Sequence, residues 1–191
     1  MGKMTTSTLL LELIKHSFFI KSTTTRLYPE GDARQVLYDS IDEFRFSVMR
    51  MLDQLAFWVI HTGIGREPAR FGISSEVIDN VLSSDGTVGI TALNVESVVG
   101  LRQYLQPNDL VRHLPVYLSA PPPAVHARRL ARKHVPKDEI DKTIEAAARM
   151  EKHARVATHI PFVFIKSDPI VRVVALEILG ALEKHRNTHH V

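Results

Sequence analysis

One stretch of the sequence, residues 87–123, constrains the fold more than any other. Two short apolar runs, Val88–Leu93 and Leu114–Leu118, enclose a segment whose apolar residues recur at helical spacing. Strands that are apolar throughout, rather than alternating, are typical of sheets that are covered on both faces. Two such strands joined through a helix are expected to be parallel, with a right-handed crossover. The sequence therefore predicts an α/β fold in which helices flank a parallel sheet.

A ligand site in a sheet of this kind is expected beyond the carboxyl ends of its strands. In this sequence those ends fall near Asn94 and at Ala120–Pro123. We therefore expect the functional residues to gather at this rim.

The rest of the chain alternates predicted helices with short predicted strands. Helices are predicted from Ser7 or Thr8 to Lys15, from Asp42 to Leu55, over Val77–Leu82 with Ser74 as its cap, over Ala124–Lys133, from Pro136 to Ala154 and over Ile170–Lys184. Strands are predicted over Phe18–Ser22, Ala56–Ile60 and Phe162–Ile165, with loops over Thr23–Arg34 and from Gly63 to Pro68.

Composition excludes several classes of function. The chain has no cysteine, which rules out disulfides, thiol catalysis and thiolate metal sites. Its ten histidines lack the spacing of metal ligands, so no metal site is expected. The basic run within residues 128–134 has no interleaved aromatic residues and is interpreted as a solvated helix face rather than a nucleic-acid interface. Charged residues interrupt the apolar N-terminal stretches, so no transmembrane segment is expected.

Common catalytic signatures are also missing. A phosphate-cradling loop needs G-x-x-x-x-G-K-[ST], because glycine amides and a lysine must surround the phosphates. The sequence contains no such motif, and it contains no G-x-G-x-x-G, G-x-S-x-G or H-E-x-x-H.

Five short motifs nevertheless follow a known order along the chain. Ser22-Thr23-Thr24-Thr25-Arg26, then Gly31-Asp32 and Tyr38, resemble the S-x-T-T-R, G-E and D-Y motifs in the nucleoside-monophosphate (NMP)-binding segment of guanylate kinases. Phe71-Gly72-Ile73-Ser74 is similar to their Y-G-T-S, Leu93-Asn94-Val95 to L-D-V, and Ala120-Pro121-Pro122 to the proline pair after the next strand. Residues 142–151 resemble the K-T-F-x-R-A-x-x-L-E helix of membrane-associated guanylate kinase homologues (MAGUKs), whose guanylate kinase domain is an interaction module.

The resemblance implies a degenerate guanylate kinase-like domain over residues 1–185, with a C-terminal tail at 186–191. It implies a P-loop-kinase-like parallel sheet, an NMP-binding-like subdomain at about 23–73 and a lid-like segment at about 124–140, with the first strand and phosphate loop missing or degenerate. Six side chains then become candidates for a GMP-like or phosphate-binding site: Ser22, Arg26, Tyr38, Phe71 and Ser74, with Arg132 in the lid.

The same resemblance shows where phosphoryl-transfer machinery is lost. Thr6 stands at the lysine position of the phosphate loop, Ala92 and Asn94 replace acidic residues, and Thr143 replaces a catalytic arginine. Pro29 falls where a second phosphate-binding arginine belongs, and Phe57 where a glutamate would read guanine. Losing one charge-stabilising donor costs about a hundred- to a thousand-fold in rate. No catalytic residue is therefore assigned, although residual kinase activity is not excluded.

Three functions stay open at this point. The favoured one is a catalytically inactive, pseudokinase-like scaffold module in the cytoplasm that binds a protein partner, in particular a phosphorylated peptide, in the former GMP site without any cofactor. Association with the cytoskeleton or a membrane is left open. The alternative is a residual guanylate kinase or GMP-binding protein, for which GMP and ATP would be the ligands. The third is a structural subunit of a larger complex, in which the missing strand leaves a sheet edge open to a partner.

Overall fold

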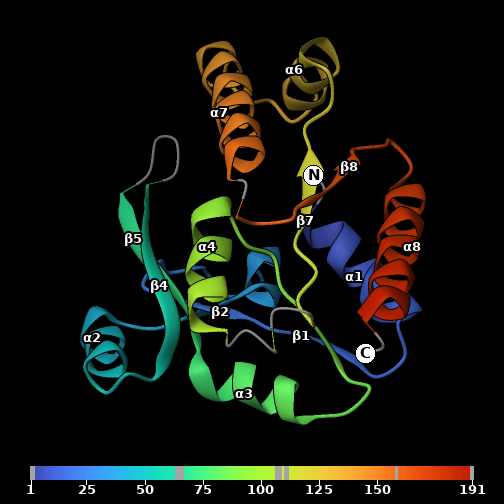
Figure 1. Cartoon of the computed structure of the whole chain (residues 1–191). Coiled ribbons are helices and arrows are strands. Elements are labelled where there is room, and N and C mark those ends of the chain that lie inside the picture. The colour runs from blue at the N-terminus through green and yellow to red at the C-terminus, as the bar shows by residue number, and fades with distance from the viewer. Residues whose placement is uncertain (1–2, 63–66, 106–108, 110–111, 158, 190–191) are drawn as a thin grey trace. The chain divides into compact units, whose positions relative to one another are not determined.

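The computed structural model describes residues 3–62, 67–105, 109, 112–157 and 159–189. It divides into two compact units, one ending at residue 110 and the other beginning at residue 111. The fold is mixed α/β with parallel strand pairs flanked by helices (Figure 1), as the sequence predicts. The expected single domain over residues 1–185 stays a prediction, and each unit is described by itself.

The first unit contains most of the short strands. Its elements are α1 (Lys3–Leu13), β1 (Ser17–Phe19), β2 (Ser22–Thr24), the 3-10 helix η1 (Ala33–Val36), β3 (Tyr38–Ser40), α2 (Glu43–Met51), β4 (Leu55–Thr62), β5 (Pro68–Ser74), α3 (Ser75–Ser83), β6 (Val88–Ile90) and α4 (Val95–Tyr104).

The first helix begins earlier than expected. Ser7 and Thr8 are predicted as caps, but α1 is already helical at Lys3, and Ser7 is a buried residue inside it. The Thr8 hydroxyl donates to the backbone oxygen of Met4, 3.1 Å away, so it is satisfied within the helix rather than capping it. No strand precedes α1 among the described residues, and helix fills the stretch where the resemblance places the phosphate loop.

A four-stranded sheet with the order β3-β2-β5-β4 dominates the first unit. β2 pairs in parallel with β3 and antiparallel with β5, which also pairs antiparallel with β4. Three local predictions are therefore wrong: the loop over Thr23–Arg34 contains part of β2 and η1, Leu55 begins a strand instead of continuing a helix, and Pro68 begins β5. Cross-strand hydrogen bonds decide these positions, and Pro68 is tolerated because it is the first residue of its strand. The rest of the predicted loop, residues 63–66, lies outside the described residues.

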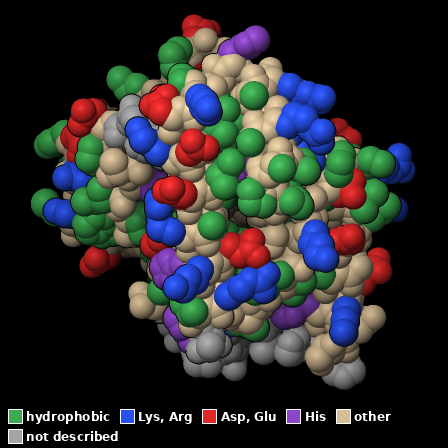
Figure 2. Space-filling view, turned by 90° about the horizontal axis from the view of Figure 1, so that it is seen from above, with side chains coloured by type: hydrophobic (Ala, Val, Ile, Leu, Met, Phe, Trp, Pro, Cys, Tyr) green, Lys and Arg blue, Asp and Glu red, His purple; other side chains and the backbone are tan. Residues whose placement is uncertain are grey.

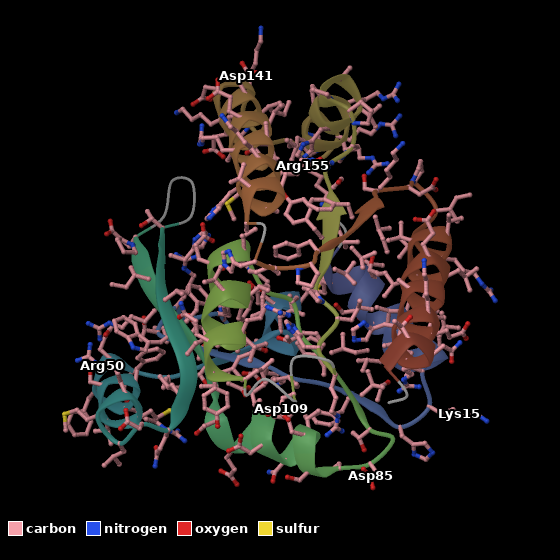
Figure 3. All side chains as sticks on the ribbon, in the orientation of Figure 1. Lys15, Arg50, Asp85, Asp109, Asp141 and Arg155 are labelled. Atoms are coloured by element: carbon pink, nitrogen blue, oxygen red, sulfur yellow. The ribbon has the colours of Figure 1, made fainter. Side chains whose placement is uncertain are left out.

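The two faces of this sheet carry different helices. Figure 1 shows α2 and α4 on opposite sides of the β4–β5 pair. On one face Arg50 of α2 lies with its guanidinium carbon 5.2 Å from the Trp58 ring centre (Figure 3). On the other face α4 packs against β4 with Gly100 over Phe57. The core of the unit gathers here, from Ile20, Phe57, Ile73, Ile78, Leu101 and Leu105.

The strand pairs at the centre of the sequence are parallel. β1 pairs with β6 from Ser17 opposite Val88 to Phe19 opposite Ile90. The second unit starts with β7 (Val116–Ser119), which pairs in parallel with β8 (Val163–Lys166). The helix predicted between β6 and β7 is α4. Because β6 and β7 belong to different units, the expected crossover between them stays a prediction.

Helices make up most of the second unit. They are α6 (Pro123–Ala131), α7 (Lys137–Val156) and α8 (Val171–His189). Tyr117, Phe162 and Phe164 form a ring cluster on the β7–β8 pair, and Arg155 of α7 lies with its guanidinium carbon 4.4 Å from the Phe164 ring centre (Figure 3).

Acidic and basic side chains are interspersed on the face drawn in Figure 2. Along α7, ion pairs four residues apart join opposite charges, including Arg155 with Glu151 at 2.6 Å. Such exposed pairs contribute about 0–1 kcal/mol each. The expectation that no nucleic acid binds stays a prediction.

Within the described ranges, no helix combines the length and the apolar composition that crossing a bilayer requires.

The close approach of α4 to β4 generates a first prediction. A Cβ added at Gly100 would lie 2.9 Å from the Phe57 Cβ, so the helix or the strand has to move. We expect Gly100→Ala to lower the free energy of unfolding by about 1–2 kcal/mol, because an overpacking cost of about 1–3 kcal/mol exceeds the gain in helix propensity.

Gly180 in α8 is the matched control. No described atom lies within 4 Å of a Cβ built there, outside its own chain neighbours and helix backbone. Both variants are compared with the parent chain by urea titration. Gly180→Ala should raise the free energy of unfolding by up to about 1 kcal/mol. A Gly100→Ala variant as stable as the parent would contradict this packing.

A hydrogen bond between α3 and α4 generates a pH prediction. The Tyr104 hydroxyl donates to Asp79 Oδ1 at 2.7 Å. Burial, this bond and the carboxylate charge raise the pKa of Tyr104 to about 12. A raised pKa in the folded state adds stability that is present below the unfolded pKa of about 10 and is lost as pH rises toward the folded value. The urea midpoint should therefore fall between about pH 10 and about pH 12, and less steeply in Tyr104→Phe.

Candidate functional site

Strand register brings three of the predicted site residues onto one face of the four-stranded sheet. Ser22 of β2 lies opposite Tyr38 of β3, and Thr24 of β2 lies opposite Phe71 of β5. Directly paired residues share a face, and side chains two apart on a strand do so as well. Ser22, Tyr38 and Phe71 therefore converge although almost fifty positions separate the first from the last.

Three rings form a row on this face. Tyr28 and Tyr38 stack, with ring centres 5.3 Å apart and planes 22° apart. Tyr38 meets Phe71 edge-on, with ring centres 5.6 Å apart. These separations lie within the range in which aromatic pairs attract each other. We call Tyr28, Tyr38 and Phe71 the aromatic row; His61 extends it through an edge contact with Phe71 at 6.2 Å.

Arg26 lies at one end of the aromatic row. Its guanidinium carbon is 5.6 Å from the Phe71 ring centre, within cation–π range. Its Nη2 donates to the backbone oxygen of Glu67 at 2.7 Å. The backbone of Arg26 is also held, since its N–H donates to Thr24 Oγ1 and its carbonyl accepts from Ser40 Oγ. A guanidinium fixed in this way presents a planar, bidentate fork suited to phosphate oxygens.

Arg34 lies at the other end, and sequence reasoning missed it. Its guanidinium carbon is 4.7 Å from the Tyr28 ring centre. Asp32 accepts from Arg34 Nε at 2.9 Å and from Nη2 at 2.5 Å, and it also accepts from the backbone N–H of Arg34 as the N-cap of η1. The D-x-R spacing carried a signal for this pairing, because an aspartate commonly caps the backbone two residues ahead.

The electrostatics of the Tyr38 phenol reflect both arginines. Burial raises the pKa of Tyr38, and the neighbouring Tyr28 phenol raises it further. The positive charges of Arg26 and Arg34 act in the opposite direction and lower the pKa of Tyr38. The phenol therefore keeps its proton at neutral pH and can donate a hydrogen bond to an anion.

The arrangement of elements matches a known enzyme structure. A solved guanylate kinase from Anaplasma phagocytophilum is similar to this chain, with a TM-score of 0.68 and 14% sequence identity. The match covers 94% of this chain and 79% of that chain. The chain has a guanylate kinase-like fold. No protein-family model matches the sequence, and no curated protein sequence matches it. At this identity the likeness concerns the fold, so the finer resemblance to the MAGUK type stays a prediction.

Three predicted site residues, Ser22, Ser74 and Arg132, lie outside the series of ring contacts that forms the aromatic row. Ser22 is 4% exposed, so little of it faces solvent. Ser74 ends β5 and is the N-cap residue of α3, without a capping hydrogen bond from its side chain. Arg132 belongs to the second unit, as the C-cap residue of α6. The binding roles of these residues stay predictions.

Four side chains at positions that the family resemblance aligns with catalytic or guanine-reading residues have local structural roles instead. Asn94 caps α4, accepting from the Ser97 N–H at 2.7 Å. Thr143 donates its hydroxyl to the backbone oxygen of Glu139 one turn earlier in α7. Thr6 is 3% exposed inside α1, and Phe57 is packed in the core.

Within the described ranges, no three His, Asp or Glu side chains come together as a metal site would require.

The position of Arg26 beside the aromatic row generates a prediction for Tyr38. Because its charge lowers the pKa of Tyr38, Arg26→Gln should raise that pKa. The measurement is a titration of ¹³C-labelled tyrosine by NMR, with Tyr38→Phe to assign the resonance. Arg45→Gln is the control, since Arg45 is an exposed residue of α2 on the opposite face of the sheet. An unchanged Tyr38 pKa in Arg26→Gln would contradict the geometry.

Proposed function

We propose that the chain is a protein-interaction module that binds a phosphorylated segment of a partner protein at the aromatic row and Arg26, without transferring a phosphoryl group. The observation that carries this proposal is the placement of Arg26. Its guanidinium is fixed between Glu67 and Phe71, on the face that also carries the Tyr38 phenol. A phosphorylated side chain brings about 1.5 to 2 negative charges and three acceptor oxygens, which suit such donors.

A peptide fits the surroundings of Arg26 better than a guanine nucleotide does. The position where the family resemblance expects a guanine-reading glutamate holds Phe57, which is 7% exposed and packed in the core. Guanine recognition needs buried polar partners for the base edge, because an unpaired polar group costs about 1–3 kcal/mol. Leu27, next to Arg26 in the sequence, is 78% exposed, and Val36 of η1 is 49% exposed. Such side chains offer apolar contacts to residues that flank a phosphorylated one.

Three other residues, Thr6, Asn94 and Thr143, argue against catalysis. Phosphoryl transfer depends almost entirely on positioning and charge neutralisation. The phosphate-loop lysine position is a buried threonine, Thr6, in a helix, and Asn94 is engaged in capping α4. Thr143, where the family resemblance expects a catalytic arginine, carries no charge. A site without these three charged groups would lose many orders of magnitude in rate.

Binding of phosphoserine peptides tests the proposal. Titration of a peptide panel should identify sequences that bind only when phosphorylated. Arg26→Gln should weaken their binding about tenfold or more, because a charge-assisted hydrogen bond contributes about 1.5–3 kcal/mol. Arg45→Gln should leave the affinity unchanged, and thermal melts should show that both variants are folded.

A nucleotide assay addresses the alternative of a residual kinase. In a coupled assay with ATP, magnesium and GMP we expect no turnover. Calorimetry with GMP alone should show no GMP binding that depends on Arg26, so the parent chain and Arg26→Gln should give the same result. Measurable turnover, or phosphopeptide binding that ignores Arg26→Gln, would refute the proposed function.

A further inference from the structure

The edge of the four-stranded sheet at β4 carries an inference that goes beyond the proposed function. We propose that two copies of this chain associate by pairing their β4 strands antiparallel, so that the two sheets join into one across a two-fold axis. The partner at this surface is therefore a second copy of the chain. The inference does not depend on phosphopeptide binding, because no group proposed to contact the peptide belongs to β4.

The two edges of this sheet differ in length and in charge. The strand order β3-β2-β5-β4 places β3 at one edge and β4 at the other. β3 has three residues, and its exposed Asp39 forms an ion pair with Lys21 at 3.2 Å. β4 has eight residues and contains no Asp, Glu, Lys or Arg. Short length and charge protect an edge strand from pairing with another chain, and β4 has neither protection.

Hydrogen bonds of Arg70 show which backbone groups of β4 point outward. The backbone oxygen of Arg70, on β5, accepts from the Thr25 N–H at 3.1 Å, and the Arg70 N–H donates to Thr25 Oγ1 at 3.0 Å. Both backbone groups of Arg70 are therefore directed away from Ile60, which lies opposite Arg70 on β4. Because these directions alternate along an antiparallel strand, the N–H and C=O groups of Trp58, Ile60 and Thr62 point to the outer edge of the sheet.

The side chains at this edge make one face of it apolar. Trp58 is 39% exposed and Ile60 is 61% exposed. Side chains alternate between the faces of a strand, so these two lie on one face, while Phe57 and Val59 contribute to the core on the other face. A long edge strand with exposed apolar side chains and no charge is a site at which another strand can add to the sheet.

A second copy of β4 is complementary to this edge. Antiparallel pairing centred on Val59 places Trp58 of each copy opposite Ile60 of the other copy. Both of these pairs lie on the same face, because the two-fold axis is perpendicular to the joined sheet. An aromatic residue opposite a β-branched one is a favourable cross-strand pair. The joined sheet then ends in a protected β3 at both sides, so the assembly closes as a dimer instead of growing.

Sedimentation velocity of the full chain over a dilution series tests the proposal. The parent chain should form a dimer that dissociates on dilution. Ile60→Lys should weaken the dimer about tenfold or more, because it places two positive charges on an edge that is otherwise uncharged. Leu176→Lys is the matched control: Leu176 is 52% exposed on α8, and its substitution should leave the dimer unchanged. Urea titration should show that both variants are folded.

A charge swap separates two-fold pairing of β4 from other forms of association. In the proposed register Ile60 and Ile60 of the second copy are diagonal neighbours, about 7–8 Å apart and within reach of long side chains. Ile60→Lys and Ile60→Glu should each weaken the dimer when measured alone, because like charges meet. An equimolar mixture of the two variants should form a mixed dimer, because opposite charges meet.

Cysteine cross-linking tests the register, because the parent chain has no cysteine. Val59 would face Val59 of the second copy in a non-hydrogen-bonded pair, with Cα atoms about 4.5 Å apart, which permits a disulfide. Val59→Cys should therefore give a covalent dimer under mild oxidation. Asp85→Cys, at an exposed position after α3 (Figure 3), should stay uncross-linked under the same conditions.

Four results would overturn the inference. They are a parent chain that stays monomeric at every concentration, association without a defined size, a dimer that Ile60→Lys leaves unchanged, and a dimer whose Val59→Cys variant does not cross-link. Loss of the dimer in both charged variants without recovery in their mixture would also contradict two-fold pairing. The Arg26→Gln variant should dimerise as the parent does, so this inference and the proposed function stand or fail separately.

Discussion

The pairing of β2 with two different neighbours is the constraint on which the rest of the first unit depends. This strand is three residues long, yet it bonds to β3 on one edge and to β5 on the other. Thr24 at its end is completely buried, so a change of register would place an unsatisfied hydroxyl or an apolar side chain on the wrong face. Every ring of the aromatic row is positioned through this strand or through the loop that follows it.

The two faces of the four-stranded sheet make different contacts. On the face that α4 covers in part, Phe57 and Ile73 belong to the core, and the same face carries the aromatic row farther along the strands. On the opposite face, α2 carries the completely buried Phe46 and also makes polar contacts, among them the ion pair of Arg70 with Glu43. The site is thus built on strands that the core already holds rigid, which is the condition for a binding geometry that does not have to be ordered by its ligand.

Sequence reasoning predicted the fold class, and it selected four residues that the structure brings together, but it failed where long-range pairing decides the local structure. The apolar runs correctly indicated two strands, β6 and β7, and the intervening helix α4. Each strand has a parallel partner, β1 for β6 and β8 for β7, while the crossover expected between β6 and β7 stays a prediction. Short polar strands such as β2 were not predicted, because a Ser-Thr-Thr stretch has no apolar pattern. It forms a strand only because it pairs with neighbouring strands. Ser22, Arg26, Tyr38 and Phe71 were identified by motif order, whereas Tyr28 and Arg34 follow no such pattern and were missed.

The sequence by itself determined the α/β class and the absence of cysteine chemistry, since these follow from residue type and local periodicity. Only the tertiary structure decided that Tyr28, Tyr38 and Phe71 form one row with an arginine at each end. The physical reason is that strand register and loop closure bring together residues whose separation in the chain carries no information about their separation in space.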